Sequence, residues 1–410
     1  MLSFLLSLVL FGQPAPEHVV GVRIQGNTLT SDAAIEQMAD VPPGTAVTPT
    51  LIADVEARLK ARGRFERVEI LKRYASISDL SQILLVIVVD EGRVAIAPMK
   101  NGQPARAVRR RGPPLMYLPI LGSDEGYGFT YGALVSMPNV AGPRTRVSIP
   151  LTWGGERRVG AEVEKRLDTP RLTRLRTGGS LIRRENQALD AVDTRAQIWV
   201  RGEREIVRAL RAGAWGGFDR VAFGPDTQVV RRAGVDVALD TRVDPMLSRN
   251  AVFVRGSLER LGLDDGRAPI RTILDANLYL PGFGASTIAL RAYRDGVNEP
   301  VPGFLQVLRG RESTLRGFRA GEVAGDSTAA GSIELRVPVT NPLSLGKLGV
   351  RAFVDAAAVY DAGARFADQR FDRGVGGGVW FTATVLRLAL DVAHGSNGST
   401  RVQVSSGLLF

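Results

Sequence analysis

Alternation between apolar and polar residues runs through the chain from about residue 117 to residue 410, with no helical period. In the stretches "RVSIPLTW" and "SIELRVPV" every second residue is apolar. A period of two is typical of β-strands, because successive side chains point to opposite faces of a sheet. Charged residues recur on the second face, as at Glu334 and Arg336, and turn signals such as "DDG" and "RDG" separate the stretches. The pattern predicts a region of many antiparallel strands.

Residues 117–410 are predicted to form a transmembrane barrel. A soluble sandwich also alternates, but about 290 residues without a helix favour a barrel whose apolar face meets lipid and whose lumen carries paired charges. At about 18 residues for each strand and its connection, this length accommodates about sixteen strands. A soluble β-propeller is the alternative, but the sequence has no repeat of blade length.

Residues 1–17 are predicted to be a signal peptide. The apolar run Leu2–Phe11 has the length of a signal-peptide core and is too short to span a bilayer as a helix. A buried N-terminal segment is the alternative. Export without a later apolar helix leaves the periplasm, the outer membrane or the exterior as the location.

Composition excludes several kinds of chemistry. The chain has no cysteine and only two histidines, so thiolate metal sites and a Ser-His-Asp triad have almost no raw material. We therefore expect no enzymatic activity, no metal and no cofactor. The net charge is +11, but the arginines are spread along the chain with few aromatic residues between them, so we expect no nucleic-acid partner.

Residues 18–93 have a different pattern and are predicted to form a small α+β domain. The strand "VVGVRIQGN" is followed by a helix capped by Ser31 and by a second helix that opens at Thr50 and ends at Gly63. Two further strands, "RFERVEILKRY" and "SQILLVIVVDEG", complete the domain. Residues 94–116 are rich in Pro, Gly and Arg and are predicted to be a linker, in which Arg109–Arg111 are either solvated or an anchor to lipid phosphates or to the periplasmic rim of the barrel.

The α+β region resembles a POTRA domain, the periplasmic module of outer-membrane assembly factors. The resemblance lies in "VRIQGN", in "RFERVEI" after Gly63 and in "LVIVVDEG". It implies that the domain binds extended polypeptides at an exposed strand edge near residues 65–73, with Phe65, Val68 and Ile70 at that edge. Backbone N–H and C=O groups at such an edge accept many sequences.

The motif "LRGF", Leu315–Phe318, resembles the loop motif of the BamA-type outer-membrane assembly factor superfamily, which combines POTRA domains with a surface-antigen β-barrel. The resemblance implies that this loop (the sixth extracellular one) folds back into the lumen and that Arg316 pairs there with acids on the barrel wall. Glu334 and Asp355 stand at the matching places, and Gly317 permits a tight turn. Ala358 replaces a glycine of the family pattern, which makes close backbone approach there less certain.

The last residues resemble the C-terminal β-signal by which outer-membrane barrels are recognised. In "VQVSSGLLF" the signal residues are Val402, Val404, Gly407 and Phe410. The glycine-rich stretch "GVGGGVWF", which begins at Gly374, is predicted to be a barrel strand whose glycines let neighbours approach, rather than a phosphate-binding loop.

The resemblance implies a protein of the bacterial outer membrane, with the POTRA domain in the periplasm, that assists insertion of other outer-membrane proteins through a lateral seam. The seam is expected between "GYGFTYGALV" and "VQVSSGLLF". The alternative is a two-partner-type secretion pore; a passive porin and an enzyme are disfavoured. The expected partners are unfolded outer-membrane or secreted polypeptides, outer-membrane lipids, and periplasmic chaperones or lipoproteins.

Overall fold

The computed structural model describes residues 16–27, 29–65, 67–76, 79–91, 94–97, 106–109, 116–124, 128–186, 190–310, 314–319, 321–340, 346–382 and 386–408. The chain forms two compact units, an N-terminal unit made mainly of residues up to 112 and a barrel unit made mainly of residues from 113 onward. Each unit is described by itself.

The N-terminal unit contains a three-stranded sheet and two helices in the predicted order of strand, helix, helix, strand, strand. Its elements are β1 (His18–Gln25), α2 (Asp32–Ala39), α3 (Pro49–Ala61), β2 (Arg67–Tyr74) and β3 (Gln82–Asp90). Strand β3 is central, parallel to β1 and antiparallel to β2. Strand β2, which contains most of the predicted binding edge, is therefore an edge strand of this sheet.

Local chemistry explains where the two helices begin. The Ser31 hydroxyl accepts a hydrogen bond from the backbone N–H of Ala34, as predicted for the first helix. The second helix begins earlier than predicted, because Thr48 rather than Thr50 is its cap: the Thr48 hydroxyl accepts from the N–H of Leu51 at 3.0 Å. Pro49 fits the first helical position, where no N–H is needed.

The core of this unit lies between the helices and the sheet. Its largest fully buried side chains come from both helices and from all three strands: Val19, Ile35, Ile52, Val55, Leu59, Ile70, Ile83, Leu85 and Ile87. Phe65, Val68 and Ile70 belong to the same core. Residues 94–116, predicted to be a linker, contain a short antiparallel pair, β4 (Val94–Ala97) with β5 (Arg106–Arg109), and the start of the barrel at Met116. Arg110 and Arg111 lie outside the described residues.

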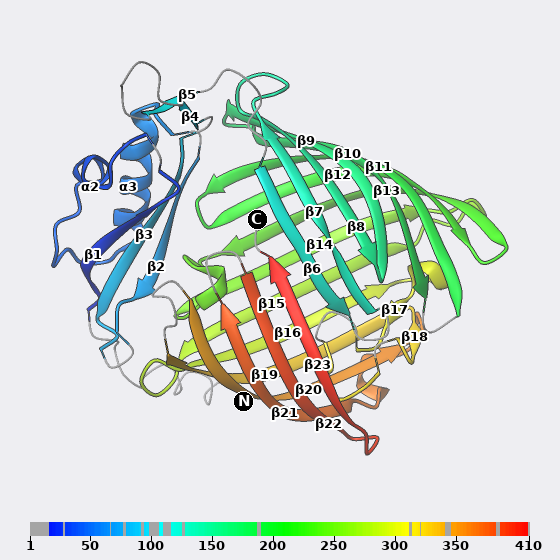
Figure 1. Ribbon diagram of the computed structural model, residues 1–410. Helices are drawn as coiled ribbons and strands as arrows, with labels where there is room; N and C mark the ends of the chain where they lie inside the picture. Colours follow the sequence, from blue (N-terminus) through cyan, green and yellow to red (C-terminus); the bar gives the residue numbers. More distant parts are fainter. Residues whose placement is uncertain are drawn as a thin grey trace. The chain divides into compact units, whose positions relative to one another are not determined.

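The barrel unit is a nearly closed sheet of sixteen antiparallel strands (Figure 1). In chain order they are β6 (Met116–Asp124), β7 (Gly128–Pro138), β8 (Thr145–Gly154), β9 (Glu156–Thr169), β10 (Leu172–Asn186), β11 (Ala191–Val207), β12 (Leu210–Phe223), β13 (Asp226–Asp240), β14 (Ala251–Gly262), β15 (Ile270–Pro281), β16 (Thr287–Val297), β19 (Ser327–Thr340), β20 (Lys347–Tyr360), β21 (Asp372–Thr382), β22 (Leu386–Gly395) and β23 (Thr400–Leu408).

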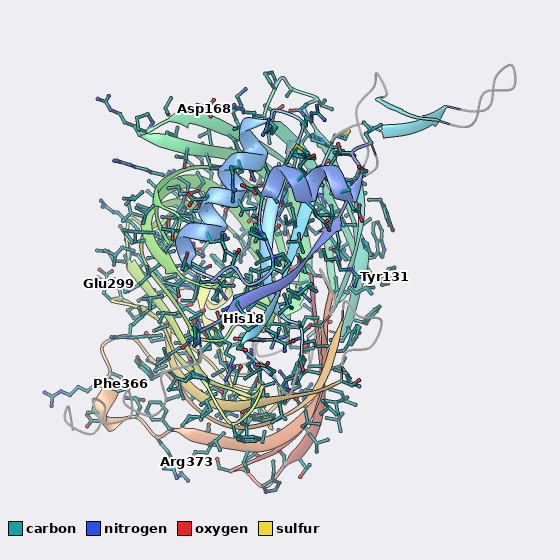
Figure 2. All side chains as sticks on the ribbon, turned by 90° about the vertical axis from the view of Figure 1, so that its left-hand side faces the viewer. His18, Tyr131, Asp168, Glu299, Phe366 and Arg373 are labelled. Carbon is teal, nitrogen blue, oxygen red and sulfur yellow. The ribbon has the colours of Figure 1, made fainter. Side chains whose placement is uncertain are left out.

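We call the end of the barrel where β6 begins and β23 stops the terminal end, and the opposite end the loop end. Asp168, near the end of β9, lies at the terminal end, and Arg373, near the start of β21, lies at the loop end; both are labelled in Figure 2. The connection from β16 to β19 at the loop end contains the short pair β17 (Val307–Leu308) and β18 (Ala324–Gly325). Short 3-10 turns occur at Pro245–Leu247, Gly303–Leu305 and Phe366–Asp368. Within the described ranges, no helix has both the length and the apolar character needed to cross a membrane.

The two faces of the barrel wall differ as the alternation predicted. Val235 and Val237 on β13 are 53% and 52% exposed, whereas Asp236 between them is 5% exposed. The buried acid is satisfied inside by Arg201, whose Nη2 donates to it at 2.8 Å. Such an apolar outer face and ion-paired inner face are typical of a barrel that spans a membrane.

The sheet ends at β6 and β23. These strands lie side by side in Figure 1, and within the described residues no paired register joins them. The predicted position of the first barrel strand was wrong by one strand, because "GYGFTYGALV" overlaps β7 and the true first strand is β6. Pro119 lies within β6, and proline is tolerated there because an edge strand leaves some N–H positions unpaired.

Candidate functional site

The loop motif lies inside the barrel, against the inner wall at strands β19 and β20. Nε and Nη2 of Arg316 donate to the two carboxylate oxygens of Asp355 at 2.7 and 2.9 Å. Its Nη1 donates to Glu334 at 2.7 Å. The structure therefore brings the three residues together as the family resemblance implied, and the planar guanidinium binds Asp355 in the two-pronged geometry that lysine cannot reproduce.

Burial makes this cluster costly to break. Arg316, Glu334 and Asp355 are 6%, 5% and 0% exposed. Asp355 also accepts from the backbone N–H of Arg316 at 3.1 Å and from the Ser332 hydroxyl at 2.6 Å. Burial by itself lowers the pKa of the Arg316 guanidinium, but the hydrogen bonds and charges of Asp355 and Glu334 outweigh it and raise that pKa above its ordinary value. The arginine is charged at every physiological pH.

Further charges extend the cluster along the wall. Nε of Arg336 donates to Glu334 at 2.6 Å, and Nε of Arg351 donates to Asp391 on β22 at 2.7 Å. Arg316 lies 3.7 Å from Asp391 as well. The sequence prediction missed this network. Alternation placed Asp391 on the charged face of its strand, but only the sheet register shows that it reaches the same cluster.

Apolar packing holds the motif on both sides of the arginine. The guanidinium carbon of Arg316 lies 3.3 Å from the ring centre of Phe353, a cation–π contact. Leu315 and Phe318 are fully buried and pack with Ala357. These contacts explain why two large apolar residues flank an arginine and a glycine in a loop.

Two glycines on the barrel wall, Gly374 and Gly395, allow the backbone of the motif to approach closely; we call them the seat of the loop. Gly317 has a φ of 90°, and a Cβ there would lie 2.8 Å from the backbone nitrogen of Gly395 on β22. A Cβ on Gly374 of β21 would lie 2.0 Å from the carbonyl oxygen of Arg316. The Ser399 hydroxyl also donates to the Gly317 carbonyl at 2.8 Å. The backbone approach that Ala358 put in doubt therefore takes place at Gly374 and Gly395.

The other predicted site residues lie apart from this cluster. Phe65, Val68 and Ile70 are buried in the N-terminal core, so their side chains are not available to a partner. Val402 and Val404 are 62% and 52% exposed on the outer barrel face.

Gly407 pairs with Arg387 of β22, and Phe410 lies outside the described residues. Of the C-terminal signal, the structure thus places three residues on the last strand.

A lumenal cavity of about 410 Å³ adjoins Arg316 and Glu334. It is lined by six arginines, Arg242, Arg291, Arg316, Arg336, Arg351 and Arg387, and by two acids, Asp275 and Glu334. In the part of the chain that the structure describes, no group of His, Cys, Asp and Glu side chains could hold a metal ion. We refer below to Arg316 with Glu334 and Asp355 as the lumenal lock.

The fold and the lock define an outer-membrane-type β-barrel with an internally anchored loop. Residues 125–410 match the family model described as the Omp85 superfamily domain, and the chain belongs to this superfamily. No curated protein sequence is significantly similar to it.

Solved structures with the same fold include BamA from Haemophilus ducreyi lacking POTRA domains 1–3, with a TM-score of 0.62 and 13% identity over 95% of this chain and 84% of that one. CdiB from Escherichia coli matches with a TM-score of 0.53 and 12% identity over 98% of this chain and 92% of that one. CdiB from Acinetobacter baumannii matches with a TM-score of 0.52 and 12% identity over 96% and 74%. Family and fold together indicate the bacterial outer membrane.

Proposed function

We propose that this protein assists the insertion of other β-barrel proteins into the outer membrane. It does so without enzymatic chemistry and without a cofactor. Its partners are unfolded outer-membrane polypeptides, delivered with the help of periplasmic chaperones or lipoproteins. The observation that carries the proposal is the interruption of the barrel between β6 and β23 within the described residues.

The proposed domain division assigns residues 1–17 to a signal peptide, 18–93 to a POTRA domain in the periplasm, 94–116 to the connecting segment and 117–410 to the barrel. The order of strands and helices in the N-terminal unit supports the POTRA assignment. The connecting segment contains the hairpin of β4 and β5.

The seam supplies the chemistry of insertion. Backbone N–H and C=O groups on a strand edge are costly in a lipid environment when no neighbouring strand pairs with them, and a client strand satisfies them by adding to the edge. This recognition depends on the backbone of the client and tolerates many side chains. The seam is therefore suited to clients that share β-structure rather than a sequence.

Capture before insertion takes place at the N-terminal unit. Strand β2 pairs with β3 on one side only within the N-terminal sheet. Because Phe65, Val68 and Ile70 are committed to the core, capture uses backbone hydrogen bonds rather than these side chains.

A two-partner-type secretion pore is the second candidate. Its support is the fold likeness to the two CdiB structures. In that case the secreted polypeptide passes through the lumen, and the lumenal lock has to release the loop for each passage. The two candidates differ in whether the seam or the lumen is the route.

A disulfide across the seam tests the route. Cysteines replacing Ile120 on β6 and either Gln403 or Ser405 on β23 should form a cross-link once their Cα atoms come within about 7 Å. The chain has no native cysteine to interfere. Oxidation should abolish client insertion in reconstituted vesicles, and reduction should restore it.

The matched control places the disulfide between strands that are already paired. Ala389 and Ser405 are register partners on β22 and β23, so linking them should leave insertion unchanged. Full insertion activity with the seam cross-linked would reject lateral opening and favour passage through the lumen.

A further inference from the structure

Exposed arginines gather on the outer face of the barrel, toward the loop end of strands β9 to β14. They are Arg157, Arg183, Arg220, Arg231 and Arg260, and all five are exposed. We call this set the arginine belt. Alternation places each of them on the face that meets lipid, in line with the exposed Val159, Leu181, Phe218, Val235 and Leu258 of the same strands.

Two members of the belt face each other directly. Arg157 on β9 and Arg183 on β10 are register partners. Side chains in such a pair have Cβ atoms about 5 Å apart, and like charges there destabilise a sheet. A site of this kind is stable when an anion bridges the two guanidinium groups.

The other three arginines form a diagonal row. Arg231 on β13 lies opposite Phe218 and Gly262, so it is a diagonal neighbour of Arg220 on β12 and of Arg260 on β14. Diagonal neighbours are about 7–8 Å apart, within the span of one phosphate group and two arginine side chains. The row therefore forms a second cationic group on the same face.

The belt is only partly neutralised by acids. Among the described residues, Arg157, Arg183, Arg220 and Arg260 have no acid within salt-bridge distance, and Arg231 has only the exposed Asp264 at 3.9 Å. The outward-facing Glu185 near this end of β10 and Asp264 still leave an excess of positive charge. By contrast, the inner arginine Arg232, next to Arg231 in sequence, is paired with both Glu259 and Asp219.

An apolar groove of about 830 Å³ adjoins the diagonal row. Ile198, Val200 and Phe218 line its apolar part together with small residues such as Gly216 and Gly262, and Arg231 and Arg260 also line it. A groove with an apolar floor and guanidinium groups at its margin matches an acyl chain attached to an anionic head group.

From the belt and the groove together we infer that this face binds a phosphorylated glycolipid of the outer leaflet, with phosphates on the arginines and an acyl chain in the groove. The inference rests on the proposed function in one respect, namely that the loop end faces the cell exterior. The head group should carry more than one phosphate, because Arg183 and Arg220 lie two strands apart, about 10 Å across the sheet. Two separate cationic groups match two phosphates at opposite sides of one head group.

Native mass spectrometry of the detergent-purified full chain tests the inference, with diphosphorylated lipid A as the probe. The wild-type protein should retain this lipid, and it should retain the same glycolipid without phosphates far more weakly. Replacing Arg231→Gln and Arg260→Gln should weaken retention about fivefold for each arginine removed. Arg171→Gln with Arg204→Gln removes two exposed arginines from the terminal end and should leave retention unchanged.

Several results would overturn the inference. One is equal retention of the phosphorylated and dephosphorylated glycolipids by the wild-type protein, a comparison that needs no variant to fold. Another is equal loss in the two double variants, and a third is equal retention of phosphatidylglycerol. Inorganic phosphate that displaces the lipid at low concentration would point to a free-phosphate site instead.

Binding is measured without a client, so a negative result here leaves the insertion proposal standing. Client insertion into vesicles that lack the glycolipid should be the same for the wild-type protein and for the double variant with Arg231→Gln and Arg260→Gln. Lost insertion with intact lipid binding would count against the proposed function alone.

Discussion

Replacing Arg316 by alanine should release the loop from the lumen. The change removes both side-chain hydrogen bonds to Asp355, one to Glu334 and the stacking on Phe353. Glu334 keeps Arg336 as a partner, but Asp355 keeps only the Ser332 hydroxyl and a backbone N–H. Removing one partner of a buried ion pair destabilises the folded state by about 3–5 kcal/mol. Because Asp355 and Glu334 keep some hydrogen-bond donors, we expect the docked loop to lose about 3 kcal/mol of stability, at the lower end of this range.

That free energy sets the size of the measurable effect. About 3 kcal/mol corresponds to a change of about 100-fold in the ratio of released to docked loop. Amide exchange in residues 314–319 should therefore become about 100-fold faster when exchange proceeds by local opening. Client insertion should fall while the protein still inserts into the membrane, because the barrel wall keeps its strand pairing.

Variants in the same region separate the lock from general loop damage. Arg319→Ala changes an exposed arginine three residues along the loop and should leave exchange and insertion unchanged. Arg316→Lys should restore only part of the protection, because one ammonium group cannot bind both oxygens of Asp355. Asp355→Asn added to Arg316→Ala should recover stability by removing the unpaired charge. If amide exchange in residues 314–319 were as slow in Arg316→Ala as in the wild-type protein, Arg316 would not hold the loop in the lumen.

Two further changes test the seat of the loop and the C-terminal signal. Gly374→Ala should displace the loop as Arg316→Ala does, because its Cβ would lie 2.0 Å from the Arg316 carbonyl oxygen. Gly256→Ala should leave the loop in place, because no atom lies within 4 Å of the added carbon. Faster proteolysis of the loop in Gly374→Ala than in Gly256→Ala would show the difference. Deleting Phe410 should lower the amount of heat-modifiable barrel in the outer membrane more than Leu274→Ala on the lipid face, and equal losses would reduce Phe410 to a packing residue.

The barrel was predictable because its determinants are local. Alternation, turn residues and the absence of a helical period are visible in any short window, and they gave the strand class and an approximate strand number. Strand β6 was missed because it is short, contains Pro119 and has a single charged residue, Asp124, at its very end. The hairpin β4–β5 was missed for a related reason, since the abundant Gly, Pro and Arg of that segment indicated a linker.

The lock was predictable only in part. The motif resemblance identified Arg316 and two of its acids, and the alternation placed both acids on the inner face. Asp391, Phe353 and the seat at Gly374 depend on which strands are neighbours and in what register, information that no single stretch of sequence contains. The arginine belt has the same origin, because Arg157 and Arg183 become partners only through the register of β9 and β10.

The placement of the lock gives the two sides of the seam different mechanical properties. The hydrogen bonds of Arg316 and Gly317 reach β19, β20 and the turn before β23, and the ion pair with Asp391 adds β22. The loop therefore braces the C-terminal flank of the seam into one stiff body. If the seam opens, β6 and the strands next to it would move, whereas the strands that the loop connects on the C-terminal side would keep their positions.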